Sequence, residues 1–309
     1  MNSPLSVDGP RGDAPAENSM FSTHALNPPA ATTTPSAVAR GGAALRALPG
    51  TLVIGLLILA CWVLITVFVP LLIGRSATEI TYGTKLQAPS SEYLFGTDAL
   101  GRDVLVRTAT AFRYDLLIAV GSVVTAAVAG LLLGALAGSS PEWIDNLVMR
   151  LLDVISAFPS FILALTLAGA LGASVGTVII AIAVVLIPQY ARGTRAAILA
   201  ERSKPYAEAA RAMALPPWRI VLIHLLPNSL GPTLTVMSME TATAIMVAAG
   251  LSFIGFGVQA PTPEWGLMIN EGSSYIVSGE WWMTFFPGLA ILSVVIGFIL
   301  LDDGFKRLR

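Results

Sequence analysis

The sequence predicts an all-α integral membrane protein with six transmembrane helices. Hydrophobic residues make up 55% of its 309 residues and charged residues only 12%, whereas soluble domains usually contain roughly 25% charged residues. Long intervals without a charged residue recur from Thr51 onward, and about 20 consecutive apolar residues are enough to cross a bilayer as a helix. The intervals are too long for the strands of a β-barrel, so helices must satisfy the backbone in lipid.

Charged residues mark the ends of the predicted spans. The interval between Asp153 and Arg192 is too long for one span, but Gly169, Gly172 and Gly176 lie inside it and favour a reversal of the chain. This interval therefore predicts a helical hairpin. The six predicted spans are 51–73, 115–138, 146–169, 175–192, 228–255 and 283–302.

The first 49 residues differ in composition from the rest of the chain. They contain seven prolines among Ala, Ser, Thr and Gly and show no apolar periodicity, so they cannot bury enough surface to offset the entropy of ordering. We expect a disordered cytoplasmic tail over 1–49 and a transmembrane domain over 50–309. The first apolar run begins near Thr51, which is too late for a signal peptide, so we expect it to be retained as a membrane helix.

The distribution of Lys and Arg predicts the orientation of the helices. With the N-terminus inside the cell, the cytoplasmic segments contain 13 of these residues and the outer segments contain 5. Cytoplasmic loops of membrane proteins carry an excess of positive charge. We therefore expect both termini, and the long connection over 203–227, to lie in the cytoplasm.

Several kinds of active site are excluded by composition. None of the three lysines stands in a Gly-Lys-Ser or Gly-Lys-Thr sequence, which a nucleotide-binding P-loop requires, so any ATP must be bound by another chain. One cysteine and two distant histidines leave little material for a metal site or for acid–base catalysis by histidine. Lys and Arg number 18 against 19 Asp and Glu, which does not favour nucleic-acid binding. We expect no catalytic residue, no metal and no cofactor.

The connection over 203–227 has the pattern of two short helices. Pro205 suits the first turn of a helix, and the pair Pro216 and Pro217 ends that helix and opens the next. In the first helix a stripe of small and apolar side chains recurs at helical spacing and is flanked by the charges of Glu208 and Arg211. The stripe consists of Tyr206, Ala209, Ala210 and Met213. Such a stripe either docks on a partner or packs under the chain's own bundle.

The same connection resembles a known signature. Glu208-Ala209-Ala210, followed by Leu225-Leu226-Pro227, is similar to the EAA signature of permease subunits of ABC importers, with Ala214 where that family usually has glycine. Further motifs resemble the second, C-type, permease of the dipeptide, oligopeptide and nickel importer family, over about residues 51–303. These motifs lie at 95–104, 157–160, 224–228, 250–255 and 261–266. Asp115 stands where the family commonly has a hydroxyl residue.

The resemblance implies a fold, a function and a set of partners. The fold would be that of a type I ABC importer permease. The chain would pair with a homologous permease in the inner membrane, be driven by two cytoplasmic ATPase subunits or domains and receive substrate from an extracytoplasmic binding protein. Di- or oligopeptides would be the substrate, with nickel as the alternative. His and Cys are nearly absent from the predicted spans, and these are the ligands that a tight nickel site would use.

The resemblance also assigns the connection over 203–227 to docking on the ATPase. Glu208 would meet a basic residue there, and ATP-driven closure of the ATPases would move the loop and tilt the membrane helices. The residues expected to form this coupling loop are Tyr206, Glu208, Ala209, Ala210, Arg211, Met213, Ala214 and Pro227.

Other residues are candidates for the translocation path or for outer structure. Glu240 near the middle of the fifth span either lines the path or makes a structural hydrogen bond, because an intramembrane carboxylate must face the bundle interior. Pro159 and Ser252 are further candidates for the path. Asp98, Arg102 and Asp103 are expected to form local ion pairs. The 256–283 loop, with Trp265, Trp281 and Trp282, suits an interfacial aromatic anchor, and a cap on the outer gate or a contact with a binding protein are equal alternatives.

Two functions of other classes stay open at this point. An ion-coupled secondary transporter with Glu240 as its relay would work without ATPase partners, and a non-transporting membrane scaffold would leave peptide uptake unchanged when it is removed. The docking pattern at 203–227 favours neither.

Overall fold

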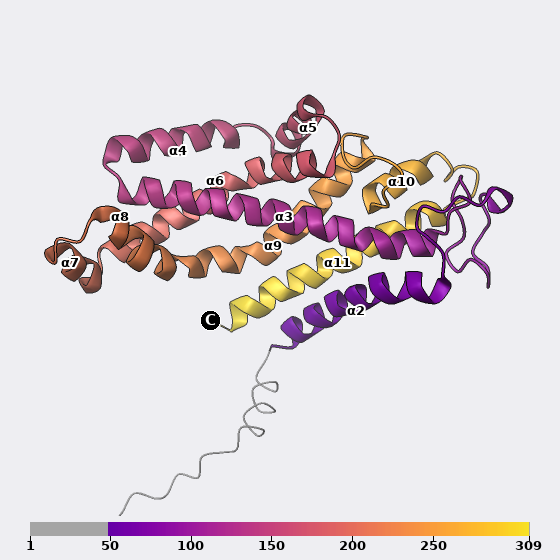
Figure 1. The fold of residues 1–309 in the computed structure, drawn as a ribbon, viewed down its shortest axis with the longest axis horizontal. Helices are drawn as coiled ribbons and strands as arrows, with labels where there is room; N and C mark the ends of the chain where they lie inside the picture. Colours follow the sequence, from indigo (N-terminus) through magenta and orange to yellow (C-terminus); the bar gives the residue numbers. More distant parts are fainter. Residues whose placement is uncertain (1–48, 309) are drawn as a thin grey trace, which may run out of the picture. The chain divides into compact units, whose positions relative to one another are not determined.

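The computed structural model describes residues 49–308, so the tail predicted for 1–49 lies outside the described residues except for Pro49. Figure 1 shows the helices, with α7 and α8 at one end of the bundle and α10 at the other. The helices are α2 (Gly50–Ile73), α3 (Val104–Ser139), α4 (Glu142–Ser156), α5 (Ser160–Leu171), α6 (Val175–Arg202), α7 (Pro205–Ala212), α8 (Pro217–Arg219), α9 (Leu226–Phe253), α10 (Trp265–Ser273) and α11 (Trp282–Arg307), with a 3₁₀ turn at Tyr82–Thr84 and a π-helical turn at Ile220–Leu225. The one β pairing in this range is an isolated bridge between Thr97 and Asp103. The all-α prediction is confirmed.

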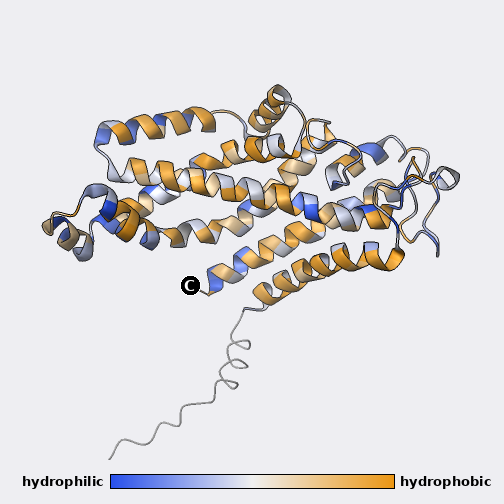
Figure 2. Ribbon diagram, viewed as in Figure 1, coloured by the Kyte–Doolittle hydropathy of each residue, from blue (hydrophilic) through white to orange (hydrophobic). Residues whose placement is uncertain are grey.

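Five helices are long and apolar enough to cross a membrane. They are α2, α3, α6, the Thr233–Phe253 part of α9, and α11, and Figure 2 shows that hydrophobic residues predominate along them. The predicted third span, 146–169, is instead divided into α4 and α5, which are bent by 87° and count as a sixth span only when taken together. Pro159 lies at the break. The helix is interrupted there because proline lacks a backbone N–H and disfavours helical geometry in the residue before it.

Two predicted spans are shorter than the observed helices by about ten residues. α3 begins at Val104 rather than at 115, and α6 continues to Arg202 rather than ending at 192. The charge-free intervals measured the apolar part of each helix, whereas the helix itself continues past charged residues. Arg107, for example, is 1% exposed on α3, because Asp98 and Glu271 accept hydrogen bonds from its guanidinium at 2.5 and 2.9 Å.

Small residues let α3 and α6 approach closely. Gly130 and Gly134 face α6, and a Cβ added at either position would lie 2.4 Å from Tyr190 Cβ or from the Ala191 carbonyl oxygen. Glycines four residues apart on a helix permit this kind of backbone contact in membranes. The contact fixes α6, whose end carries the connection to α7.

The α10 end of the bundle is held by buried charges. Asp98 pairs with Arg102 at 2.6 Å as predicted, and Glu271 of α10 accepts hydrogen bonds from both Arg102 and Arg107 at 2.9 Å. Asp103 was expected to pair locally but pairs with Arg75 at 3.0 Å. The segment between α2 and α3 is therefore held together by the pair of Arg75 and Asp103 and is tied to α10 through Arg102.

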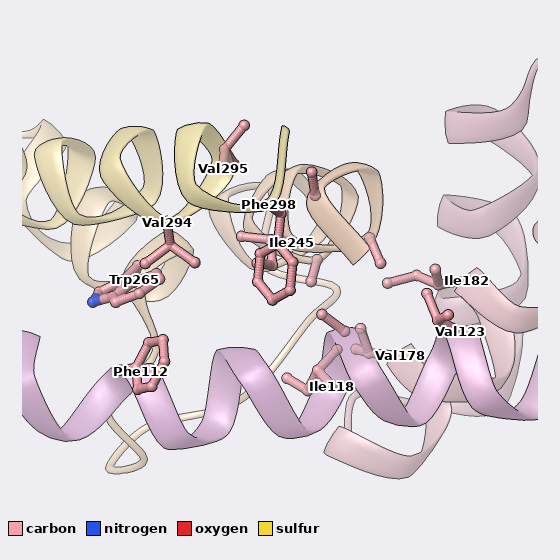
Figure 3. Close-up of a cluster of buried hydrophobic side chains, with 14 of the residues drawn as sticks. Phe112, Ile118, Val123, Val178, Ile182, Ile245, Trp265, Val294, Val295 and Phe298 are labelled. Atoms are coloured by element: carbon pink, nitrogen blue, oxygen red, sulfur yellow. The ribbon is translucent and has the colours of Figure 1, made fainter. Parts of the chain in front are cut away.

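Two of the three tryptophans expected to form an aromatic anchor are buried, Trp265 at the start of α10 and Trp282 at the start of α11, so that prediction is wrong for these two. Trp265 is fully buried and Trp282 is 6% exposed, whereas Trp281 is 49% exposed. Figure 3 shows Trp265 between Phe112 and Val294. Its indole N–H donates to the Thr108 carbonyl at 2.9 Å, which satisfies the polar end of the ring inside the core.

A pair of carboxyl groups explains how α10 starts. Glu264 accepts hydrogen bonds from the backbone N–H groups of Gly266 and Leu267 and so caps the helix. Asp115 of α3 accepts from the Trp265 N–H at 3.3 Å, so a second fully buried carboxyl group lies at the start of α10 beside Glu264. Burial raises the pKa of Glu264, and the two backbone N–H groups that it caps oppose this shift.

Candidate functional site

The connection between α6 and α9 folds as two short helices, as the sequence predicts. α7 begins at Pro205, which occupies a first-turn position, and α8 begins at Pro217 in the same way. The π-helical turn at 220–225 then leads into α9, whose first turn contains Pro227. The Asn228 side chain donates to the His224 carbonyl at 2.7 Å across this junction. Pro227 itself is exposed.

One face of α7 packs on its own chain. Ala207 and Ala210 are 0% and 3% exposed and lie in one apolar cluster with Ile198, Ile220 and Leu225. Ala210 therefore belongs to the internal face, whereas the sequence pattern grouped it with the residues available to a partner. The stripe predicted from the sequence did not include Ala207, although its spacing of three residues from Ala210 places both on one face of a helix.

The other face of α7 is exposed. Tyr206 is 36% exposed and Met213 is 68% exposed, and Ala209 lies between them on the exposed surface. Figure 1 shows α7 at the tip of the bundle. Small and apolar side chains exposed side by side make this face suitable for contact with another protein.

The two charged side chains that flank this face, Glu208 and Arg211, differ in whether the chain itself supplies a partner. Glu208 is exposed, and no cation of the described residues forms an ion pair with it. Arg211 donates to the Arg202 carbonyl at 3.0 Å, so its side chain is held against α6. Glu208 is thus the acid that remains available for a partner's cation.

Tyr206 is held in place by a residue that the sequence analysis missed. Its hydroxyl donates to the Glu201 carboxylate at 2.5 Å, and Lys204 pairs with the same carboxylate at 2.7 Å. Partial burial and the hydrogen bond to Glu201 raise the pKa of Tyr206, so the tyrosine is neutral at physiological pH. No pattern marked Glu201, because it belongs to the end of α6.

Ala214 adopts a backbone conformation that suits glycine. Its φ is 55°, and it follows the end of α7 at the position where helices commonly end with a left-handed glycine. The Leu215 N–H bonds to the Ala210 carbonyl at 3.4 Å and the Ala214 N–H to the Arg211 carbonyl at 2.9 Å, which together form a Schellman motif. The left-handed conformation gives a physical reason for glycine at this position.

Replacing Ala214 with glycine is expected to stabilise the end of α7 by up to about 1 kcal/mol, because glycine adopts positive φ without steric cost. The amide protons of Ala214 and Leu215 should then exchange up to about fivefold more slowly, as measured by hydrogen–deuterium exchange. Ala212→Gly is the matched control, because the same change inside the helix should accelerate exchange. Faster exchange in Ala214→Gly would contradict the assignment.

The three path candidates do not form one site. Glu240 is 7% exposed and accepts a hydrogen bond from the Gln189 side chain at 2.6 Å, which joins α9 to α6. Ser252 is 1% exposed, and its hydroxyl accepts from the Val258 N–H at 3.2 Å, which fixes the turn after α9. Twelve residues separate these two positions, or about 18 Å along the helix. Pro159 is exposed at the bend between α4 and α5.

No group of three or more His, Cys, Asp or Glu residues positioned to hold a metal ion occurs within residues 49–308. Of the acidic side chains described above, Asp103 and Glu264 cap helices, and Asp98, Glu201 and Glu240 pair with arginine, lysine and glutamine.

Comparison with known proteins decides the family. The profile of the "binding-protein-dependent transport system inner membrane component" family matches residues 130–308. The chain belongs to this family. It is 39% identical over 254 residues to the dipeptide transport system permease protein DppC of Alkalihalophilus pseudofirmus, covering 82% of this chain and 83% of the relative.

Other relatives agree with this assignment. The chain is 38% identical to the di/tripeptide transport system permease protein DppC of Pseudomonas aeruginosa, over 82% of this chain and 85% of the relative. It is also 38% identical to the glutathione transport system permease protein GsiD of Pectobacterium atrosepticum, over 71% and 73%. This inner membrane component is therefore a multi-pass membrane protein and an ABC transporter permease, a class in which a partner chain hydrolyses ATP.

The fold also matches a solved transporter. The inward-facing MetNI methionine ABC transporter contains a chain that aligns with a TM-score of 0.51 and 21% identity, over 67% of this inner membrane component and 95% of the solved chain. The prediction of a type I ABC importer permease fold is confirmed.

Proposed function

We propose that this chain is one permease subunit of an ATP-driven, binding-protein-dependent importer of di- or oligopeptides. The observation that supports the substrate is the identity of 37–39% to relatives named as permeases for dipeptides, di- and tripeptides and D,D-dipeptides, each over more than four fifths of this chain. In this proposal a homologous permease supplies the other half of the translocation path. Two ATPase subunits and an extracytoplasmic binding protein complete the complex.

The proposed orientation places the α7 end of the bundle in the cytoplasm, together with both chain termini. The excess of Lys and Arg in the segments assigned to that side supports it. The opposite end, with α10 and the segment before α3, would then face the binding protein.

The proposed coupling site is the loop over 203–227. Tyr206, Glu208, Ala209 and Met213 present the docking face, and their exposure supports this assignment. Ala210, Ala214 and Pro227 would shape the loop rather than touch the ATPase, and Arg211 would hold it against α6 through its hydrogen bond to the Arg202 carbonyl.

The hydrogen bond between Gln189 and Glu240 suggests how movement passes into the membrane. It joins α6, which precedes the coupling loop, to α9, which follows it. Both helices would therefore move together when the loop is displaced. We assign Glu240 to this link, and we assign Pro159 to a bend that permits α5 to tilt near the path.

Reconstitution in lipid with the partner chains tests the function. A binding protein loaded with dipeptide is expected to stimulate ATP hydrolysis severalfold above the rate with an unloaded binding protein, because loaded binding protein favours the conformation in which the ATPases close. Nickel-loaded binding protein should give no stimulation. Stimulation by nickel-loaded but not by dipeptide-loaded binding protein would show that the chain belongs to a nickel importer. Substrate uptake without the ATPase chains would show that it is a secondary transporter.

A further inference from the structure

We propose that a cavity at the α10 end of the bundle binds the phosphate headgroup of a membrane phospholipid. The cavity has a volume of about 590 Å³ and lies between the end of α2, the segment 75–78, the first turns of α3 and the segment 261–263. Two arginines, Arg75 and Arg113, line it together with several hydroxyl side chains. Among its described lining residues none is acidic, so the cavity favours an anion.

Arg75 is occupied by other groups. Its guanidinium donates to Asp103 at 3.0 Å and to the Glu92 carbonyl at 3.0 Å, and it lies over the Tyr93 ring at 4.2 Å. These contacts fix Arg75 as one wall of the cavity and offset its charge. The positive charge that remains is that of Arg113.

Arg113 has no carboxylate partner among residues 49–308. It is exposed, and its contacts are a hydrogen bond to the Tyr114 hydroxyl at 3.1 Å and the face of the same ring at 4.8 Å. A guanidinium has five N–H donors, so most of its donors are free for a ligand. Arginine binds phosphate with paired hydrogen bonds, and the hydroxyls of Thr110 and Thr262 lie on the same cavity.

The position of the cavity indicates a lipid rather than a free anion. Val67, Pro70 and Leu71 of α2 form its apolar wall. Thr66, the deepest α2 residue of the cavity, is eight residues, or about 12 Å, from the helix end at Gly74. The cavity therefore extends from the level of lipid headgroups into the level of the acyl chains.

The surface of α2 next to the cavity is apolar and open. Leu71 and Leu72 are 71% and 83% exposed, and Phe68 is 51% exposed. The acyl chain of a bound phospholipid would cover these residues while the phosphate of the same lipid reaches Arg113. A ligand with one anionic group and a long apolar part matches the cavity and the adjoining surface, which a free phosphate ion does not.

Native mass spectrometry of the complex with its partner chains tests the proposal. The complex is delipidated and titrated with phosphatidylglycerol. Arg113→Gln is expected to lower the affinity for the tightest-bound lipid by roughly tenfold to a hundredfold, because it removes a charge-assisted hydrogen bond. Arg113→Lys should lose less, since it keeps the charge. Excess inorganic phosphate should not displace the lipid.

Arg150→Gln is the matched control, because Arg150 is also an exposed helical arginine without an ion pair in the described chain but lies on α4. It should leave lipid affinity unchanged. Equal affinity in wild type and Arg113→Gln would overturn the proposal, as would equal loss in the control or displacement by inorganic phosphate. Unchanged lipid binding with weaker retention of a partner chain in Arg113→Gln would assign the cavity to a protein carboxylate instead.

Discussion

Replacing Glu208 with arginine is expected to abolish the stimulation of ATP hydrolysis by peptide-loaded binding protein. Glu208 is exposed on α7 and has no cationic partner in the described part of the chain, so it is available to pair with a basic residue of the ATPase. Reversing one charge of a buried interfacial pair costs about 2–5 kcal/mol of association or more. Hydrolysis in the reconstituted complex, measured with loaded and unloaded binding protein, should fall to the unstimulated rate in the variant.

Two further variants separate coupling from folding. Glu208→Gln keeps the size of the side chain and removes the charge, so it should lose part of the stimulation. Glu142→Arg makes the same charge change at an exposed residue of α4 that has no ion pair in the described part of the chain and lies outside the loop over 203–227, and it should retain full stimulation. Full stimulation in Glu208→Arg would remove this residue from the coupling mechanism.

Replacing Trp265 with alanine is expected to destabilise the chain by about 3–5 kcal/mol, because removing a fully buried tryptophan leaves a large cavity. The ring packs against Trp62 and Phe112 with centroid distances of 5.3 and 6.1 Å. The variant also leaves the Thr108 carbonyl without its indole donor. Thermal unfolding in detergent, followed by circular dichroism, should show a clear fall in midpoint temperature.

Graded changes distinguish packing from hydrogen bonding at this position. Trp265→Phe keeps an aromatic ring and loses the N–H donor, so it should cost less than alanine, about 1–3 kcal/mol. Trp143→Ala is the control, since Trp143 is 67% exposed on α4, and its effect should stay within about 0.5 kcal/mol. If Trp143→Ala destabilised the chain as much as Trp265→Ala, the core assigned to Trp265 would be wrong.

The sequence alone was sufficient to predict where the two short helices of the coupling loop begin. Pro205 and Pro217 begin their helices as predicted, because the fixed φ of proline acts on its own residue and its neighbours. The exposure of Glu208 followed from the polar character of a short helix outside the membrane. The glycine-like geometry of Ala214 was not predictable from periodicity, because φ at a helix end depends on the hydrogen bonds that close it.

Contacts between distant segments were the part that the sequence left open. Arg107 and Glu271 lie 164 positions apart and form an ion pair, and Asp115 accepts a hydrogen bond from the Trp265 N–H, 150 positions away. The predicted start of the second span was late for this reason, because a charge was taken as the end of a helix. A buried charge is tolerated when a partner is present, and the partner is known only from the fold.

The sequence by itself determined that this chain is a helical membrane protein of the permease type, since composition, charge-free intervals and short motifs are local properties of the chain. The tertiary structure decided which face of α7 is free and that α4 and α5 form a bent pair. It also placed Trp265 in the core and left Arg113 without a carboxylate partner among the described residues. Each of these four features depends on contacts between residues that are far apart in the sequence, because side-chain packing and ion pairs form between segments that only the fold brings together.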